Sequence, residues 1–202
     1  SSMRERKYAY SASNDLLLEQ HLLYSDQSMM SYTEKTGSKY RTLPQLLMLE
    51  RMTKEDFAHY QQRNMDWLIA RSTVSISDDG CLRINKIRAY ILKDLFTNEV
   101  ICPAYYDPVL KQQVEELVSA GDLKYENTLF SKPEQDYLNY VLNKSEFSNG
   151  LDLRNRYSHD TCSLDEKTQS RDYLELLKIM VFIIIKINEE FCINNPMQDV
   201  HE

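Results

Sequence analysis

The chain has 202 residues, of which 42% are hydrophobic and 27% charged, and this composition is typical of one globular domain or two small ones. Its four glycines are too few for the glycine-rich loops of Rossmann dinucleotide-binding domains and P-loop nucleotide hydrolases, so both classes are excluded. The net charge of −7 counts against non-specific coating of nucleic acid, because such binding depends on a basic surface that neutralises phosphates. A local nucleic-acid site remains compatible with this charge.

The cysteines favour a reduced, cytoplasmic protein without a metal or another cofactor. The four cysteines are Cys81, Cys102, Cys162 and Cys192. No two of them form a C-x-x-C pair, so the spacing required by a zinc ribbon or a thioredoxin-type site is missing. A chain of this length needs no disulfide framework, and no secretory apolar region is evident. The longest apolar run, residues 179–185, is far shorter than the roughly 20 residues that span a bilayer, so no membrane partner is expected.

Residues 1–103 predict a helical region that carries one small β-hairpin. Hydrophobic periodicity and capping residues predict helices over 13–24, 43–51, 53–71 and 86–96, with a loop over 25–42. The third helix should bury a stripe of Phe57, Tyr60, Trp67 and Leu68, and the fourth should bury Ile87, Ile91, Leu92 and Leu95. Alternating segments on either side of an Asp-Gly turn predict the hairpin over 73–84, and Asn85 is expected to cap the helix that follows.

The helical pattern breaks over 97–106, and we place a domain boundary there, between 1–103 and 104–202. Helices are expected over 107–120, 131–143, 151–159 and 169–191, the second of which starts with a Ser131/Glu134 capping box. These helices predict an antiparallel bundle. The apolar run 179–185 should lie in its most buried helix.

One motif carries a functional signal. It reads Gly150-Leu-Asp-Leu-Arg-Asn-Arg-Tyr-Ser-His-Asp160 and precedes the long apolar helix. It resembles the HEPN superfamily (higher eukaryotes and prokaryotes nucleotide-binding), whose hallmark is Arg, a polar residue that is often Asn, three to five further residues, and then His. Arg154, Asn155 and His159 occupy these positions, and the resemblance covers about the second half of the chain.

The resemblance implies a HEPN-like helical bundle that forms a homodimer through the motif region. It further implies a metal-independent endoribonuclease that cleaves RNA as a toxin or in antiviral defence, together with an antitoxin or regulatory partner. Other members of the superfamily have lost catalysis. The alternative is therefore a non-catalytic dimer that binds nucleotide, RNA or a protein.

The residue chemistry fits metal-independent RNA cleavage. Histidine transfers protons near neutral pH, and arginine offers a planar, permanent cation to a charged phosphorane. Asn155 and His159 are four residues apart on one helical face, so the amide would orient the imidazole. Arg154 lies about 140° around the helix from His159, and a twofold pair of motifs would bring two copies of each to one cleft. We also expect substrate contacts from Arg156 and Tyr157.

Other interpretations stay open. Arg154 could pair with Asp152 or Asp160, with Asn155 capping a turn and His159 an ordinary surface residue. Ser158, His159 and Asp160 are the residue types of a hydrolase triad, but sequence neighbours cannot converge in that geometry. His159 and Cys162 would supply only half of a metal site. The hairpin could instead be the wing of a DNA-binding winged helix, with phosphate contacts from Arg83, Lys86, Arg88 and Lys93, although such charges also occur on ordinary solvated faces.

Overall fold

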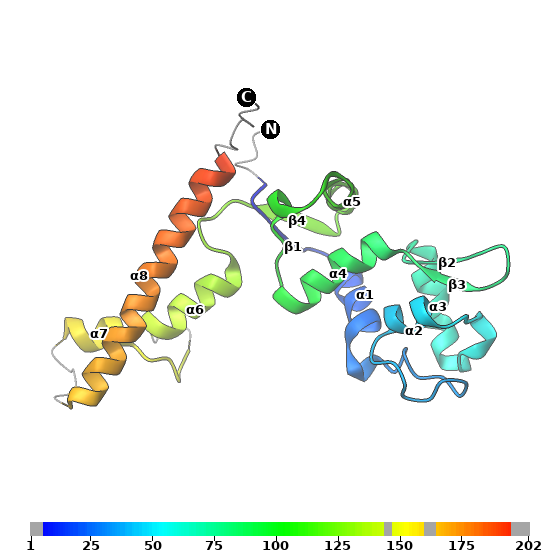
Figure 1. Ribbon diagram of the computed structural model, residues 1–202, viewed down its shortest axis with the longest axis horizontal. Coiled ribbons are helices and arrows are strands. Elements are labelled where there is room, and N and C mark those ends of the chain that lie inside the picture. Colours follow the sequence, from blue (N-terminus) through cyan, green and yellow to red (C-terminus); the bar gives the residue numbers. More distant parts are fainter. Residues whose placement is uncertain (1–5, 144–146, 160–164, 195–202) are drawn as a thin grey trace, which may run out of the picture. The chain divides into compact units, whose positions relative to one another are not determined.

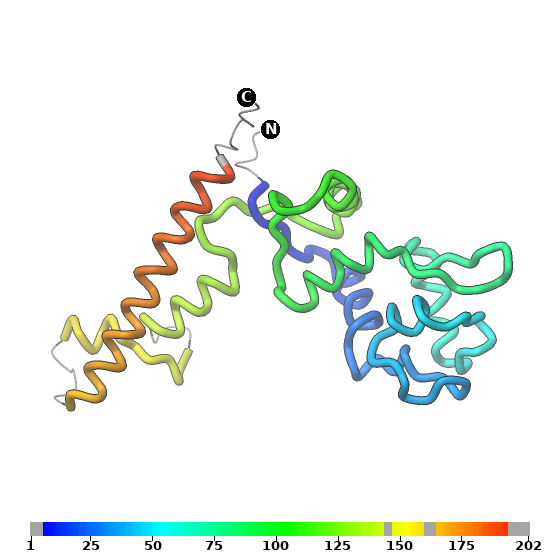
Figure 2. Tube along the Cα trace, viewed as in Figure 1, coloured from blue at the N-terminus to red at the C-terminus, as the bar shows by residue number. Residues whose placement is uncertain are grey.

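The computed structural model describes residues 6–143, 147–159 and 165–194 (Figure 2). They are mainly helical, as the sequence predicts, with two small antiparallel sheets (Figure 1). The chain divides into two compact units. The N-terminal unit is Tyr8–Glu126, and the C-terminal unit combines Ser1–Lys7 with Asn127–Glu202.

The division between the units falls after Glu126, further along the chain than the predicted boundary between 103 and 104. The reason is a long-range strand pair, in which β1 (Tyr8–Ser11) lies antiparallel to β4 (Leu123–Glu126). Ala9 is fully buried in this pair and also bridges to Ile101. The residues between 104 and 126 therefore belong to the N-terminal unit.

Local capping determines where the helices of the N-terminal unit begin. The Ser13 hydroxyl accepts from the amide of Leu16, and the Asn85 side chain accepts from the amide of Arg88. Asp107 caps a later helix in the same way. The helices of this unit are α1 (Asn14–Tyr24), α2 (Leu43–Leu49), α3 (His59–Ala70), α4 (Lys86–Asn98) and α5 (Pro108–Ser119). Short 3-10 turns occupy Asp26–Ser28, Lys54–Asp56 and Pro103–Tyr105.

The predicted continuous helix over 53–71 is wrong, because the chain is extended at Phe57 and Ala58 between a 3-10 turn and α3. This break lets Phe57 enter the core at 2% exposure. The Gln61 side chain then accepts from the amide of Ala58 and donates to two loop carbonyls, which starts α3 anew. Two predicted core residues are also exposed, Tyr60 at 62% and Ile87 at 38%.

The predicted hairpin is present, with β2 (Val74–Ile76) antiparallel to β3 (Leu82–Ile84). Its turn is organised by Asp79, which accepts from the Ser77 hydroxyl and the Cys81 amide. These hydrogen bonds, helped by the charge of Arg51, lower the pKa of Asp79 to about 2. A turn of local contacts is the kind of feature that sequence patterns indicate well.

A buried ionic network joins helices of the N-terminal unit. The Glu19 carboxylate has no solvent exposure and accepts from Arg71 at 2.8 Å, from Arg88 at 2.6 Å and from the Thr73 hydroxyl. Asp122 also binds Arg71, at 2.6 Å. Burial raises the pKa of Glu19, but hydrogen bonds from Arg88, Thr73 and Arg71 outweigh it and leave the pKa below its usual value.

The C-terminal unit contains α6 (Lys132–Leu142), α7 (Leu153–Ser158) and α8 (Glu166–Asn194). The Ser131/Glu134 capping box begins α6, as predicted. Val141, Leu153 and Ile179 form a small core, one from each helix. Two buried lysines pair with carboxylates in this unit: Lys7 with Glu190 at 2.7 Å, and Lys186 with Glu134 at 3.0 Å.

The prediction that 179–185 forms the most buried helix is wrong for the isolated chain. Within that run Ile179 is buried, whereas Ile184 and Ile185 are 55% and 56% exposed. The predicted all-helical bundle over 104–202 is also wrong, because β4 lies within that range. Among the described residues, no helix combines the length and the hydropathy needed to cross a membrane.

Candidate functional site

The motif lies on α7, a short helix that a tight loop holds against α6. The Leu151 amide donates to the Tyr140 carbonyl at 2.9 Å, and the amide of Gly150 donates to Phe147 at 2.9 Å. Gly150 has no room for a side chain, since a Cβ there would lie 2.8 Å from the Tyr140 carbonyl oxygen. Leu153 then inserts into the small core at 1% exposure. The apolar residue before Arg154 thus fixes one face of α7 and leaves the opposite face to solvent.

Arg154, Asn155 and His159 are all exposed on this helix and its C-terminal cap. Nη1 of Arg154 makes a long contact of 3.4 Å to the Asn143 side chain. Among the described residues, no ion pair holds Arg154 and no side-chain hydrogen bond holds the His159 imidazole. Their charged and titratable groups are therefore accessible to a ligand.

The structure does not place the Asn155 amide against His159. The Asn155 Nδ2 atom donates instead to Oδ1 of Asp152 at 2.8 Å. His159 caps the helix with φ −120° and ψ 24°, so its side chain leaves the direction that a continuing helix would impose. Only the backbone joins the two residues, through the His159 amide and the Asn155 carbonyl at 3.1 Å.

Arg156 and Tyr157 turn toward α8 and contact Asp172. The Arg156 guanidinium approaches both carboxylate oxygens, at 2.6 and 3.4 Å, and the Tyr157 hydroxyl donates to Oδ2 at 3.0 Å. Asp172 is itself buried at 5% exposure. Sequence reasoning missed this acceptor, because nothing in the local pattern distinguishes Asp172 from the other acidic residues of the helix. In this arrangement the two residues expected to contact substrate fasten α7 to α8.

The other candidate sites gain little from the structure. Asp160 and Cys162, which the triad and half-metal-site interpretations require, lie outside the described residues. Within the described ranges, no group of His, Cys, Asp and Glu is arranged to hold a metal ion. Of the proposed winged-helix contacts, Arg88 is held by Glu19 and Arg83 lies 3.5 Å from Asp79.

The site residues therefore separate into an exposed group, Arg154, Asn155 and His159, and an anchoring group, Arg156 and Tyr157. In comparisons with known proteins, the chain matches no family model, no curated protein and no solved structure.

Proposed function

We propose that this protein is a metal-independent endoribonuclease of HEPN type, acting through Arg154 and His159. The observation that carries the proposal is the pairing of a guanidinium and an imidazole, both exposed and free of ion pairs in the described residues, within one short helix and its cap. This pair supplies an electrostatic and a proton-transfer group. A toxin or antiviral defence role, with an antitoxin or regulatory partner, belongs to the same proposal.

In the proposed reaction, the 2′-hydroxyl of the RNA attacks the adjacent phosphorus and the 5′-oxygen leaves. A base takes the proton from the 2′-oxygen, and an acid gives one to the departing 5′-oxygen. The products are a 2′,3′-cyclic phosphate and a 5′-hydroxyl. His159 acts as base or acid, and Arg154 binds the phosphorane oxygens through its planar fork.

One motif offers one histidine to a reaction that uses two proton transfers, so a second copy of the motif completes the proposed site. The outer face of α8 supports such pairing. Its exposed apolar residues alternate at spacings of four and three, the seam pattern of paired helices: Tyr173, Leu177, Met180, Ile184, Ile187 and Phe191. An apolar stripe of this length is uncommon on the surface of a monomer.

The position of the motif limits how two α8 helices can pair in this dimer. Arg156 and Tyr157 fasten the motif near Asp172, at the N-terminal end of the 29-residue helix. An antiparallel pair in full overlap would place Asp172 of one helix opposite Asn188 of the other, which separates the two motifs by about 24 Å at 1.5 Å per residue. The proposed site therefore requires the two N-terminal ends of α8 to lie together.

Cleavage of labelled single-stranded RNA tests the catalytic proposal. His159→Ala should lower the rate by about 10²–10⁴, the usual loss for one acid–base group. Arg154→Ala should be similarly inactive, and Arg154→Lys should retain part of the activity, because a point charge replaces the bidentate fork. His59→Ala, an exposed histidine of the N-terminal unit, is the matched control and should cleave normally. Activity should survive EDTA and produce a 2′,3′-cyclic phosphate, whereas undiminished cleavage by His159→Ala would refute the assignment.

Light scattering tests the dimer. Ile184→Asp should convert a dimer to a monomer and abolish cleavage, because it places a charge in the α8 seam. Ile76→Asp is the matched control, since Ile76 has the same 55% exposure in the hairpin of the other unit. A wild-type monomer at tens of micromolar, or an unchanged dimer in Ile184→Asp, would contradict pairing through α8.

A non-catalytic dimer that binds RNA, nucleotide or a protein is the second candidate. The contact that favours it is the Asn155–Asp152 hydrogen bond, which draws the amide away from the expected role of orienting His159. The two candidates differ in one result. A binding module would retain RNA affinity in the wild type without releasing any cleaved product.

A further inference from the structure

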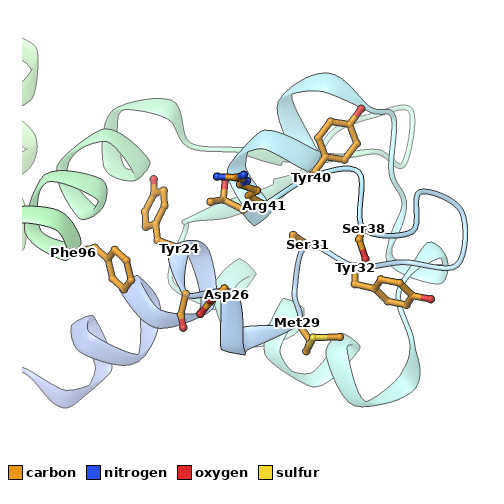
Figure 3. A pocket seen from close by; sticks show the side chains of 11 residues that line it. Tyr24, Asp26, Met29, Ser31, Tyr32, Ser38, Tyr40, Arg41 and Phe96 are labelled. Atoms are coloured by element: carbon orange, nitrogen blue, oxygen red, sulfur yellow. The ribbon is translucent and has the colours of Figure 1, made fainter.

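A groove in the N-terminal unit combines aromatic and basic side chains. Its larger part is a hollow of about 650 Å³ beside the end of α1 and the loop over 25–42, lined among others by Tyr24, Tyr40, Arg41 and Phe96 (Figure 3). A second hollow, of about 290 Å³, reaches along α4 to Lys86, Tyr90 and Lys93. Tyr24 and Thr42 line both hollows, which makes them neighbouring parts of one groove.

The charges along this groove are unusual for an acidic chain. Arg41, Lys86 and Lys93 are exposed, and none forms an ion pair among the residues that the structure describes. Asp26 is the acidic residue among those that line the two hollows. A net charge of −7 offers phosphates little general attraction, so three cations gathered in one groove form a distinct local site.

The basic and aromatic groups alternate along one helical face. Lys86, Tyr90 and Lys93 are spaced by four and then three residues, which brings them to the same side of α4. Tyr90 is 52% exposed, and the ring of Tyr106 stands edge-on to it at 6.1 Å. This support holds the Tyr90 ring while leaving much of it accessible.

The aromatic side chains of the larger hollow are also held in place. The Tyr24 hydroxyl donates to the Ala89 carbonyl, and its ring lies 5.9 Å from that of Phe96. Tyr40 donates its hydroxyl to Glu50. Rings positioned before a ligand arrives lose little side-chain freedom on binding, which favours affinity.

We propose that this groove binds single-stranded RNA, with phosphates on Lys86, Lys93 and Arg41 and bases stacked on the tyrosine rings. Positively charged grooves with aromatic platforms suit single strands, because unpaired bases expose their faces whereas a duplex hides them. Asp26 can accept hydrogen bonds from base amino groups or ribose hydroxyls. The choice of RNA over DNA rests on the proposed nuclease function. The groove belongs to the N-terminal unit, and Arg154 and His159 belong to the C-terminal unit.

Fluorescence anisotropy with a labelled, mixed-sequence single-stranded RNA tests the proposal, with full-length His159→Ala protein used throughout to prevent cleavage. The double variant Lys86→Ala/Lys93→Ala should weaken binding at least tenfold. It should also reduce the slope of log Kd against log salt by about 1.4, since each phosphate contact to a single strand contributes about 0.7. Tyr90→Leu should lose about tenfold in affinity, and Tyr90→Phe should retain it, because stacking needs the ring and not the hydroxyl.

Arg63→Ala/Lys111→Ala is the matched control, because it removes the same charge from the same unit at positions outside the groove. Wild-type affinity in this control, with loss in the groove variants, supports the proposal. Equal losses in both double variants, no binding of single-stranded RNA, or equally tight binding of duplex RNA or single-stranded DNA would overturn it. If the protein binds RNA through the groove but cleaves none, only the proposed nuclease function is refuted. If it cleaves RNA and the groove variants keep wild-type affinity, only the proposed RNA binding in the groove is refuted.

Discussion

Replacing Glu19 with glutamine should strongly destabilise the N-terminal unit. The substitution keeps the size of the side chain but removes the charge that faces two guanidinium groups. Glu19 is fully buried, whereas the side chains of Arg71 and Arg88 are 18% and 11% exposed. Glutamine can accept a hydrogen bond from one of them but cannot neutralise either.

The expected loss follows from what remains around the two arginines. Removing one partner of a buried ion pair typically costs about 3–5 kcal/mol, because the other charge stays buried without compensation. Asp122 still lies 2.6 Å from Arg71 and 3.7 Å from Arg88, which limits the damage. We therefore expect a loss of about 3 kcal/mol in the free energy of unfolding, near the lower end of that range.

Urea unfolding followed by tryptophan fluorescence measures this loss in the appropriate unit. Trp67 is the one tryptophan of the chain, and its ring lies 5.2 Å from the Arg71 guanidinium carbon. A loss of about 3 kcal/mol should lower the unfolding midpoint by about 2 M for a slope near 1.5 kcal/mol/M. Glu55→Gln, an exposed carboxylate of the same unit, should change stability by less than about 0.5 kcal/mol. A Glu19→Gln midpoint equal to that of Glu55→Gln would refute the reasoning.

The pH dependence provides a second check on the same network. The folded pKa of Glu19 is lowered from 4.5, so the unfolded chain binds this proton more readily than the folded one. The stability that the charged Glu19 contributes is therefore present above the pKa that Glu19 has in the unfolded chain, and it is lost as the pH falls through the lower pKa of the folded state. The difference in unfolding free energy between wild type and Glu19→Gln should be constant near neutral pH and shrink below about pH 4.5. A difference that grows on acidification would contradict the sign.

Three further predictions concern the motif helix and the hairpin. Asp172→Asn should loosen α7, because it weakens the hydrogen bonds that Arg156 and Tyr157 donate to this side chain. We expect the free energy of unfolding to fall by about 1.5–3 kcal/mol and the amides of α7 to exchange faster. The control Glu166→Gln should change neither quantity. Unchanged exchange would show that other contacts hold the helix. Gly150→Ala should lower the thermal midpoint, because the new Cβ would lie 2.8 Å from the Tyr140 carbonyl, and a variant as stable as wild type would exclude this close approach. Asp79 should titrate at about pH 2 when followed through the Cys81 amide resonance. Its contribution to the hairpin should be complete above its usual pKa of 3.8 and decline as the pH falls from there to about 2; a midpoint near 4 would exclude the hydrogen-bonded turn.

Sequence patterns alone predicted the features that short-range interactions control. The side chains of Ser13, Asn85 and Asp107 begin helices because each accepts from an amide within three residues of itself. At the start of α6, the Glu134 side chain accepts from the Ser131 amide three residues before it. The hairpin could be predicted equally well, since an Asp-Gly turn favours reversal of the chain direction whatever packs around it. The motif could be placed on a short helix for the same reason, and its exposed Arg154, Asn155 and His159 stand out as residue types.

Tertiary structure decided what depends on contacts distant in sequence. Strand β1 has no signal of its own, because its partner β4 lies more than a hundred residues away, and the same pairing moved the division between the units. The break before α3 arises because burying Phe57 outweighs helical propensity. Asp172 became the partner of Arg156 and Tyr157 only when α7 packed on α8. Hydrophobicity predicted that α8 would be buried, yet a helix can bury only the faces that meet a neighbour, and one face of α8 meets none among the described residues of its own unit.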